Sequence, residues 1–252
     1  MQVHMTPLEQ FRVEPLFPLH LAGYNIAFTN QAAIMCVIVA VMSLFLFLAV
    51  RKGRLVPTRS QSIAELGYEF VANMIESTAG KDGLRFFPFV FAIFMFVLCS
   101  NYFGLIPGVF TVTSQIAVNF ALACLVMAVV IFFGFLFHGV GFLKLFVPDA
   151  PWVLLPLLIP IEIISFFFRP ISLSVRLFAN MLAGHTMLKV FGGFVILLGT
   201  AGGILSLVAV GPMFMIIAIM ALEFLVAFLQ AYVFAMLTCI YLNESLHLHG
   251  HH

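Results

Sequence analysis

Charged side chains are scarce in this sequence. Only 8% of its 252 residues are Asp, Glu, Lys or Arg, whereas a soluble domain carries about 25%. The 11 basic residues barely outnumber the 10 acidic ones, so no basic surface is available to neutralise a nucleic-acid backbone. Hydrophobic residues make up 63% of the chain. We therefore expect a membrane protein whose solvent is the lipid bilayer, and we exclude a nucleic-acid partner.

Cysteine is also scarce. The four cysteines, at positions 36, 99, 124 and 239, all lie within apolar runs, where they behave as small hydrophobic residues without metal-ligand spacing. The final histidines permit either a metal-binding tail or an exposed polar end, and we favour a polar tail over residues 248–252. We expect no metal site and no cofactor.

The first apolar run predicts a membrane helix over residues 30–51, because about 20 apolar residues are needed to cross the hydrocarbon. Arg51, Lys52, Arg54 and Arg59 follow this run closely, and short basic loops remain on the cytoplasmic side. Residues 1–29 then form an N-terminal segment on the outer side. Their early charges do not match a removable signal peptide.

Residues 84–143 are predicted to form a membrane helical hairpin. No charged residue occurs between Phe86 and Leu143, and glycine and proline near Gly104 mark the turn.

Residues 60–81 precede this hairpin and have helical amphipathic periodicity. Ile63, Leu66, Phe70 and Met74 share one face, and the opposite face carries Glu65, Glu69, Asn73 and Glu76. We expect a surface helix that packs against the protein or a partner, since an acidic face does not attract anionic lipid.

Residues 150–247 predict a second, longer helical hairpin. Its first arm, Trp152 to Lys189, would measure about 57 Å, nearly twice the hydrocarbon thickness of about 30 Å. This arm either breaks at Pro156, Pro160 or Pro170 or lies steeply tilted. The predicted fold class is an all-α integral membrane protein, with about five membrane helices, one amphipathic surface helix, and the last two helices long and steeply tilted.

Polar residues interrupt both long arms at membrane depth. The first arm carries Glu162, Arg169, Arg176, Asn180, His185 and Lys189, and the second carries Glu223 and Gln230. Because each central charge costs about 2.5 to 3.5 kcal/mol, a set of this size predicts a function. Arg176 is the strongest candidate, since arginine cannot release its proton and no acid lies within one helical turn. We expect it to face an acid from another chain.

For the remaining residues, two interpretations stay open. Arg169 and Lys189 either join a functional path or extend their charges to the membrane interfaces. Asn180 and Gln230 are either polar neighbours of that path or hydrogen-bonding contacts between helices. Glutamate and histidine in partly buried positions can exchange protons near neutrality. This chemistry favours a proton path through Glu162, His185 and Glu223.

The stretch from Arg169 to His185, RPISLSVRLFANMLAGH, resembles the signature of subunit a of rotary F-type ATP synthases. Glu223 with Gln230, the segment NYFGLIP at 101–107 and the order of the spans are also similar. The resemblance extends over about residues 30–244. A histidine on the first long helix with an acid on the second is the arrangement of the mitochondrial and alpha-proteobacterial branch, reversed from that of many bacterial relatives.

The resemblance implies a non-catalytic stator subunit with two aqueous half-paths that do not meet. Arg176 would lie between them and face the carboxylates of a rotating ring of c subunits. Asn180 and Gln230 would be its polar neighbours, and His185 with Glu223 would form a paired site. Further expected partners are b-type subunits of a peripheral stalk. The expected location is a bacterial inner membrane, with a mitochondrial inner membrane as the alternative.

The topology assigns the two half-paths independently. With the N-terminus outside and the C-terminus cytoplasmic, the first long helix begins inside, so Glu162 belongs to the inner half-path. His185 and Glu223 then belong to the outer half-path, which Asn101, Gln115 and Asn119 extend as an outer vestibule. The alternative functions are a secondary transporter, another ion-coupled channel or a structural anchor. A transporter would usually show inverted repeats, and we find none in the sequence.

Overall fold

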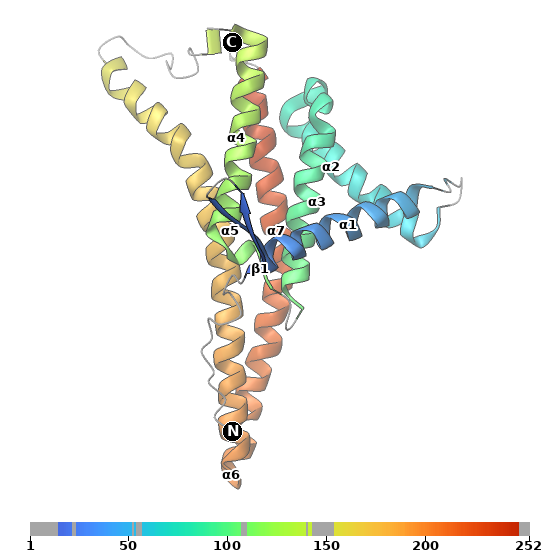
Figure 1. Ribbon diagram of the computed structural model, residues 1–252, viewed down its shortest axis with the longest axis vertical. Helices are drawn as coiled ribbons and strands as arrows, with labels where there is room; N and C mark the ends of the chain where they lie inside the picture. Colours follow the sequence, from blue (N-terminus) through green and yellow to red (C-terminus); the bar gives the residue numbers. More distant parts are fainter. Residues whose placement is uncertain are drawn as a thin grey trace. The chain divides into compact units, whose positions relative to one another are not determined.

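Figure 1 shows the computed structural model, which describes residues 15–21, 24–51, 53, 57–106, 110–139, 141–142 and 154–246. The predicted polar tail at 248–252 and the first 14 residues of the predicted N-terminal segment lie outside this part. Five helical stretches in it are long and apolar enough to cross a membrane: Asn30–Val50, Arg59–Gly104, Ile116–His138, Leu155–Thr200 and Ser206–Ser245. The predicted all-α integral membrane fold is confirmed.

Two short strands precede the first membrane helix. β1 (Pro15–Leu21) and β2 (Tyr24–Thr29) pair antiparallel, with Leu21 opposite Tyr24. The sequence did not predict them, because six or seven residues give a weak periodic signal and an isolated two-stranded pair is only marginally stable. α1 (Asn30–Val50) follows directly. The Thr29 hydroxyl accepts a hydrogen bond from the Ala32 amide at 3.3 Å and thereby caps this helix.

The chain divides into two compact units, which we describe separately. The α2 unit comprises Ser43–Met95, Ile116–Arg176 and Ala231–His252. It contains α2 (Arg59–Gly83), η2 (Leu84–Phe86), the first part of α3 (Phe87–Gly104) and α4 (Ile116–His138). Its buried core is apolar and includes Val71, Ile75, Val90, Phe94, Val126 and Val130.

Glycines shape this unit at two positions. Gly80 has a φ of +66°, which favours glycine, and it marks a kink within α2. Gly134 on α4 lies directly against the ring of Phe142, and a Cβ at this position would overlap that ring. The missing side chain therefore allows an aromatic ring to contact the α4 backbone.

The predicted amphipathic helix at 60–81 corresponds to α2, but its buried face was predicted only in part. Met74 is buried and Phe70 contacts the Phe94 ring at 5.5 Å between centroids, whereas Ile63 and Leu66 are 61% and 65% exposed. A stripe offset by one residue is buried instead: Val71, Ile75 and Ala79. The sequence pattern counted every apolar residue, but among the described residues the buried apolar side chains of α2 lie in its second half.

The α3 unit comprises Met1–Met42, Phe96–Gln115 and Leu177–Gln230. It contains the end of α3, η3 (Val112–Ser114) and segments of α5 (Leu155–Thr200) and α7 (Val210–Leu246). These two segments lie side by side in Figure 1, and Gly184 on α5 contacts Glu223 on α7. Gly202 and Gly203, with φ values of +70° and +65°, form the turn between α5 and the short helix α6 (Ile204–Val208).

α5 extends further than the sequence predicted. It is 46 residues long and ends at Thr200 rather than Lys189, which corresponds to about 69 Å. Gly192 and Gly193 do not end it, because a glycine costs a helix only about 1 kcal/mol and backbone groups in lipid must be satisfied internally. Pro160 and Pro170 lie inside the helix, so neither breaks it. The predicted starting residue, Trp152, lies outside the described part of the chain.

Candidate proton-exchange sites

A cluster of opposite charges joins α5 to the end of α7 within the α2 unit. Arg169 forms an ion pair with Glu244 and a longer one, 3.7 Å, with Glu162. Its guanidinium also lies 5.0 Å from the ring centroid of Tyr241, close enough for a cation–π contact. We call Glu162, Arg169, Tyr241 and Glu244 the Arg169 cluster. Its single cation has two carboxylate partners, so its charge is locally compensated.

Arg176 has a different environment, although it lies seven residues later on the same helix. Its side chain is exposed, and no described carboxylate of the α2 unit forms an ion pair with it. With Arg169 it lines a groove of about 330 Å³ that includes Ser165, Ser172 and Tyr241. The polar groups facing this groove are guanidinium and hydroxyl donors, which suit an anionic group supplied from outside the unit.

Glu223 is the buried acid of the α3 unit. Its side chain is only 4% exposed, and neither carboxylate oxygen has a hydrogen-bond partner among the described residues. The carboxylate lies against Gly184, where a Cβ would overlap it. An unpartnered buried carboxylate is costly in its charged form, so this side chain is suited to taking up and releasing a proton.

His185 immediately follows Gly184 and is half-buried. Its Nε2 atom lies 3.2 Å from the hydroxyl oxygen of Thr111, which belongs to the segment between α3 and η3. We call Thr111, Gly184, His185 and Glu223 the Glu223 site. Glu223 thus contacts the glycine that precedes His185 in the sequence, and the pairing of His185 with Glu223 stays a prediction.

The other predicted polar residues are distributed over both units. In the α3 unit, Asn101 is fully buried and donates a hydrogen bond to the Ala227 carbonyl oxygen at 3.1 Å. Partly exposed side chains in the same unit are Gln115, Asn180, Lys189 and Gln230. Asn119 is buried on α4 and belongs to the α2 unit. The three residues predicted as one vestibule are therefore divided between two units.

Comparison with known proteins identifies the family. Residues 32–243 match the family described as ATP synthase A chain. The chain belongs to the family of ATP synthase a subunits. It is 56% identical to ATP synthase subunit a of Mesorhizobium japonicum over 242 residues, 96% of each chain. It is 57% identical to that of Chelativorans sp., covering 96% of this chain and 97% of the relative, and 54% identical to that of Rhizobium etli, covering 97% and 98%.

Membership of this family makes the protein a membrane subunit of an ATP synthase, and the similarity to alpha-proteobacterial relatives agrees with the order of His185 and Glu223. Within the described residues of this a subunit, no group of three His, Cys, Asp or Glu side chains could hold a metal ion.

Sequence reasoning missed three residues of these sites: Glu244, Tyr241 and Thr111. Their importance comes from contacts between distant parts of the chain, since Glu244 is 75 positions from Arg169 and Thr111 is 74 positions from His185. One signal was available for Glu244. It is an acid in the last turns of an apolar helix, at the end where the antiparallel partner carries Arg169.

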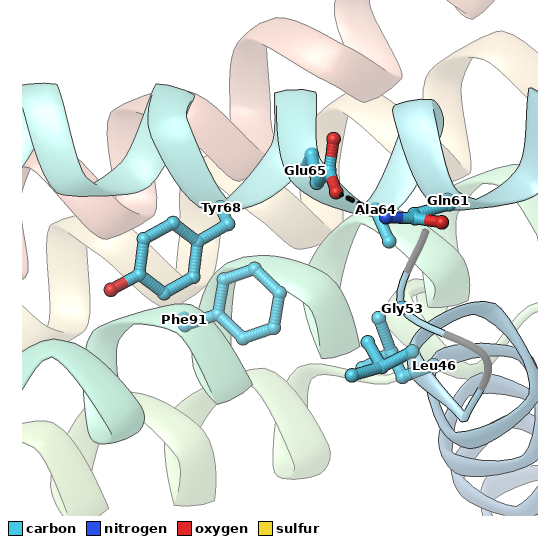
Figure 2. A pocket seen from close by; sticks show the side chains of 8 residues that line it. Leu46, Gly53, Gln61, Ala64, Glu65, Tyr68 and Phe91 are labelled. Carbon is cyan, nitrogen blue, oxygen red and sulfur yellow. Dashed lines mark hydrogen bonds between the residues drawn. The ribbon is translucent and has the colours of Figure 1, made fainter. Parts of the chain in front are cut away.

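The a subunit has another groove, between α1, α2 and α3 within the α2 unit. It has a volume of about 420 Å³ and is lined by Leu46, Val50, Gly53, Gln61, Ala64, Glu65, Tyr68 and Phe91. Figure 2 shows Gln61 donating a hydrogen bond to Glu65 at 2.8 Å, with the Tyr68 and Phe91 rings beside it. None of the predicted proton-path residues lines this mainly apolar groove.

Proposed function

We propose that this chain is the proton-translocating stator subunit of an F-type ATP synthase, with Arg176 facing the carboxylates of a rotating ring of c subunits. The observation that carries the proposal is the contrast between two arginines. Arg169 is compensated by Glu162 and Glu244, whereas Arg176 is exposed and has no carboxylate partner among the described residues of its unit. A permanent cation on an apolar helix requires an anion from outside to offset its desolvation.

The electrostatic magnitudes suit reversible proton transfer. A ring carboxylate surrounded by lipid is favoured in its protonated, neutral form, because an isolated charge in an apolar medium is strongly disfavoured. Near the Arg176 guanidinium, at about 4 Å and an effective dielectric constant of about 20, the ionised form gains roughly 4 kcal/mol. This gain is comparable to the effective desolvation cost of several kcal/mol. Arg176 can therefore ionise each arriving carboxylate without holding it permanently.

Two half-paths deliver and remove the protons on either side of Arg176. Glu162 belongs to the inner half-path, and its side chain is 38% exposed, so the described residues do not enclose it. The outer half-path passes through His185 and Glu223, and the burial of Glu223 without a hydrogen-bond partner supports this role. Asn180 and Gln230 provide polar groups near the ring, and Asn101, Gln115 and Asn119 contribute to the outer vestibule.

The same proposal covers the assembly and its location. The c subunits form the ring that carries the carboxylates, and b-type subunits of the peripheral stalk hold this chain against rotation. The complex lies in a bacterial inner membrane, with the N-terminus outside and the C-terminus in the cytoplasm. This orientation is supported by the basic residues that follow α1.

The test is the replacement of Arg176 in membranes that carry the assembled complex. Arg176→Ala is expected to abolish proton-driven ATP synthesis and to increase passive proton leakage, because the fixed charge between the half-paths is lost. Arg176→Lys is also expected to fail, since an amine lacks the guanidinium geometry and can lose its proton. A matched control is Arg85→Ala, which removes an exposed arginine paired with Asp82 at 3.6 Å. Near-normal synthesis by Arg176→Ala would refute the proposal.

A further inference from the structure

Thr111 is held in place by three contacts within the α3 unit. Its carbonyl oxygen accepts hydrogen bonds from the Ser114 amide at 3.2 Å and from the Ser114 hydroxyl at 2.6 Å. Its methyl group packs against Gly104, where a Cβ would lie 2.6 Å from the Thr111 Cγ2. The residue is 2% exposed. The position of its hydroxyl group is therefore fixed by packing and by the η3 turn.

The Thr111 hydroxyl lies between two partners. Its oxygen is 3.4 Å from the Gly104 carbonyl oxygen and 3.2 Å from His185 Nε2. A hydroxyl has one proton to donate, and a carbonyl oxygen can only accept. Both contacts are satisfied together only if Thr111 donates to Gly104 and His185 Nε2–H donates to Thr111.

We propose that Thr111 is a positioning residue for His185: it holds the neutral imidazole in the Nε2–H tautomer, so that the transported proton is gained and lost at Nδ1. This inference rests on the proposed function, because it assigns a partner to the histidine of the outer half-path. The hydrogen bond made by one ring nitrogen determines what the other nitrogen can do. A fixed tautomer and ring orientation give every transfer the same starting geometry.

Two ionisable groups lie close to the backbone on either end of this part of α5. Glu223 on α7 lies against Gly184, which precedes His185, and Lys189 lies one helical turn later on α5. The charge of Lys189 affects how readily the ring binds a proton. The Thr111 hydroxyl is the group that contacts a ring nitrogen, so it acts most directly on which nitrogen carries the proton of the neutral ring. The tautomer is therefore the specific readout of the Thr111–His185 contact.

The first experiment measures the tautomer. The full-length chain, labelled with ¹⁵N-histidine and reconstituted in liposomes, is studied by solid-state NMR above the pH at which His185 is protonated. His185 is assigned by the signals that disappear in His185→Gln. Thr111→Val, which keeps the shape but removes the hydroxyl, is expected to raise the Nδ1–H population about fivefold, the factor that a typical net hydrogen bond supplies. Thr111→Ser should restore the wild-type ratio.

The second experiment measures ATP-driven proton pumping by the assembled complex in membrane vesicles. Thr111→Val is expected to lower pumping about fivefold, with Thr111→Ser largely retaining it. Gly104→Ala should resemble Thr111→Val, since the added methyl group would lie 2.6 Å from Thr111 Cγ2 and displace that residue. The matched control is Thr186→Val, next to His185, because the Thr186 hydroxyl donates to the Leu182 carbonyl of its own helix at 2.7 Å and, in the described part of the chain, to no other residue.

Failures of the inference and of the proposed function can be distinguished. An unchanged His185 tautomer in Thr111→Val overturns the inference, even if His185→Gln abolishes pumping. A changed tautomer with normal pumping in Thr111→Val overturns the positioning role. Normal pumping by His185→Gln, a variant that leaves Thr111 intact, instead refutes the place of His185 in the proposed outer half-path and removes the function that Thr111 was inferred to support.

Discussion

The Arg169 cluster and the Glu223 site both include residues of α5 and α7, but they differ in whether their acidic side chains have a partner. In the Arg169 cluster, the carboxylates of Glu162 and Glu244 share one guanidinium. In the Glu223 site, a more deeply buried carboxylate has no hydrogen-bond partner among the described residues. A compensated charge favours one fixed arrangement of two helices, whereas an uncompensated one leaves the protonated and ionised forms closer in free energy. This difference supports our proposal that the Arg169 cluster holds the two helices together and that the Glu223 site exchanges protons.

The largest expected effect compares the two acids directly. Glu223→Gln removes the exchangeable proton at nearly constant volume and should lower ATP-driven proton pumping about 100-fold, the lower range for loss of a positioned proton-transfer group. Glu244→Gln keeps an acceptor for Arg169 and should lower pumping less than about fivefold. Both variants are measured in vesicles with equal amounts of assembled complex. Equal losses would erase the distinction between the two regions.

A second prediction concerns the proposed pairing of His185 with Glu223. Exchanging both residues should retain more pumping than the two single changes predict when combined, because groups that act as a unit are not additive. The double-mutant cycle is read from initial pumping rates of His185→Glu, Glu223→His and the exchanged pair. Strictly additive losses would identify two independent residues.

A third, smaller effect concerns the close packing at Gly184. Gly184→Ala places a methyl group where the Glu223 carboxylate lies, and overpacking of this kind typically costs about 1 to 3 kcal/mol. We expect earlier thermal inactivation of the complex and reduced pumping. Gly193→Ala is the control on the same helix, because no neighbouring atom lies within 4 Å of its Cβ position. An alanine tolerated equally at both positions would contradict the described contact.

The smallest expected effect concerns the ion pair in the Arg169 cluster. The side chains of Arg169 and Glu244 are 20% and 35% exposed, so solvent reduces their coupling to about 1 kcal/mol, near the upper value for accessible pairs. A double-mutant cycle with Arg169→Gln and Glu244→Gln, followed by thermal unfolding of the complex, measures it. The Arg85–Asp82 pair, with both side chains more than half exposed, should show no measurable coupling. Comparable coupling in both pairs would contradict this ranking.

The sequence predicted the membrane helices well, since the length of an uninterrupted apolar run is a direct physical requirement for crossing lipid. It predicted the end of α5 poorly. The expected arm ended at Lys189, but the helix continues through Gly192 and Gly193 to Thr200 and turns at Gly202 and Gly203, where the φ values are positive. Glycine alone does not distinguish these two uses, because the backbone conformation that it adopts depends on the packing of the whole hairpin.

Contacts over long sequence separations were the other limit. The seven-residue spacing of Glu162, Arg169 and Arg176 could not reveal that, of the two arginines, Arg169 alone has carboxylate partners among the described residues, because Glu244 comes from another helix. In the same way, apolar periodicity in α2 could not show that Val71 is buried and Leu66 exposed. Such distinctions depend on neighbouring elements, about which local pattern carries little information.

Pro160 and Pro170, which α5 accommodates without ending, affect the mechanics of this helix. Each lacks an amide hydrogen, so each removes one bond from the backbone ladder that normally resists bending. The segment around Arg169 is therefore more compliant than an uninterrupted helix, while its two carboxylate partners limit how far it moves. In the proposed function α5 is a stator helix that faces a rotating ring, and such a helix would experience a fluctuating load at every step. Local bending at the prolines would absorb part of that load, so α5 would deform elastically while it continues to position its side chains.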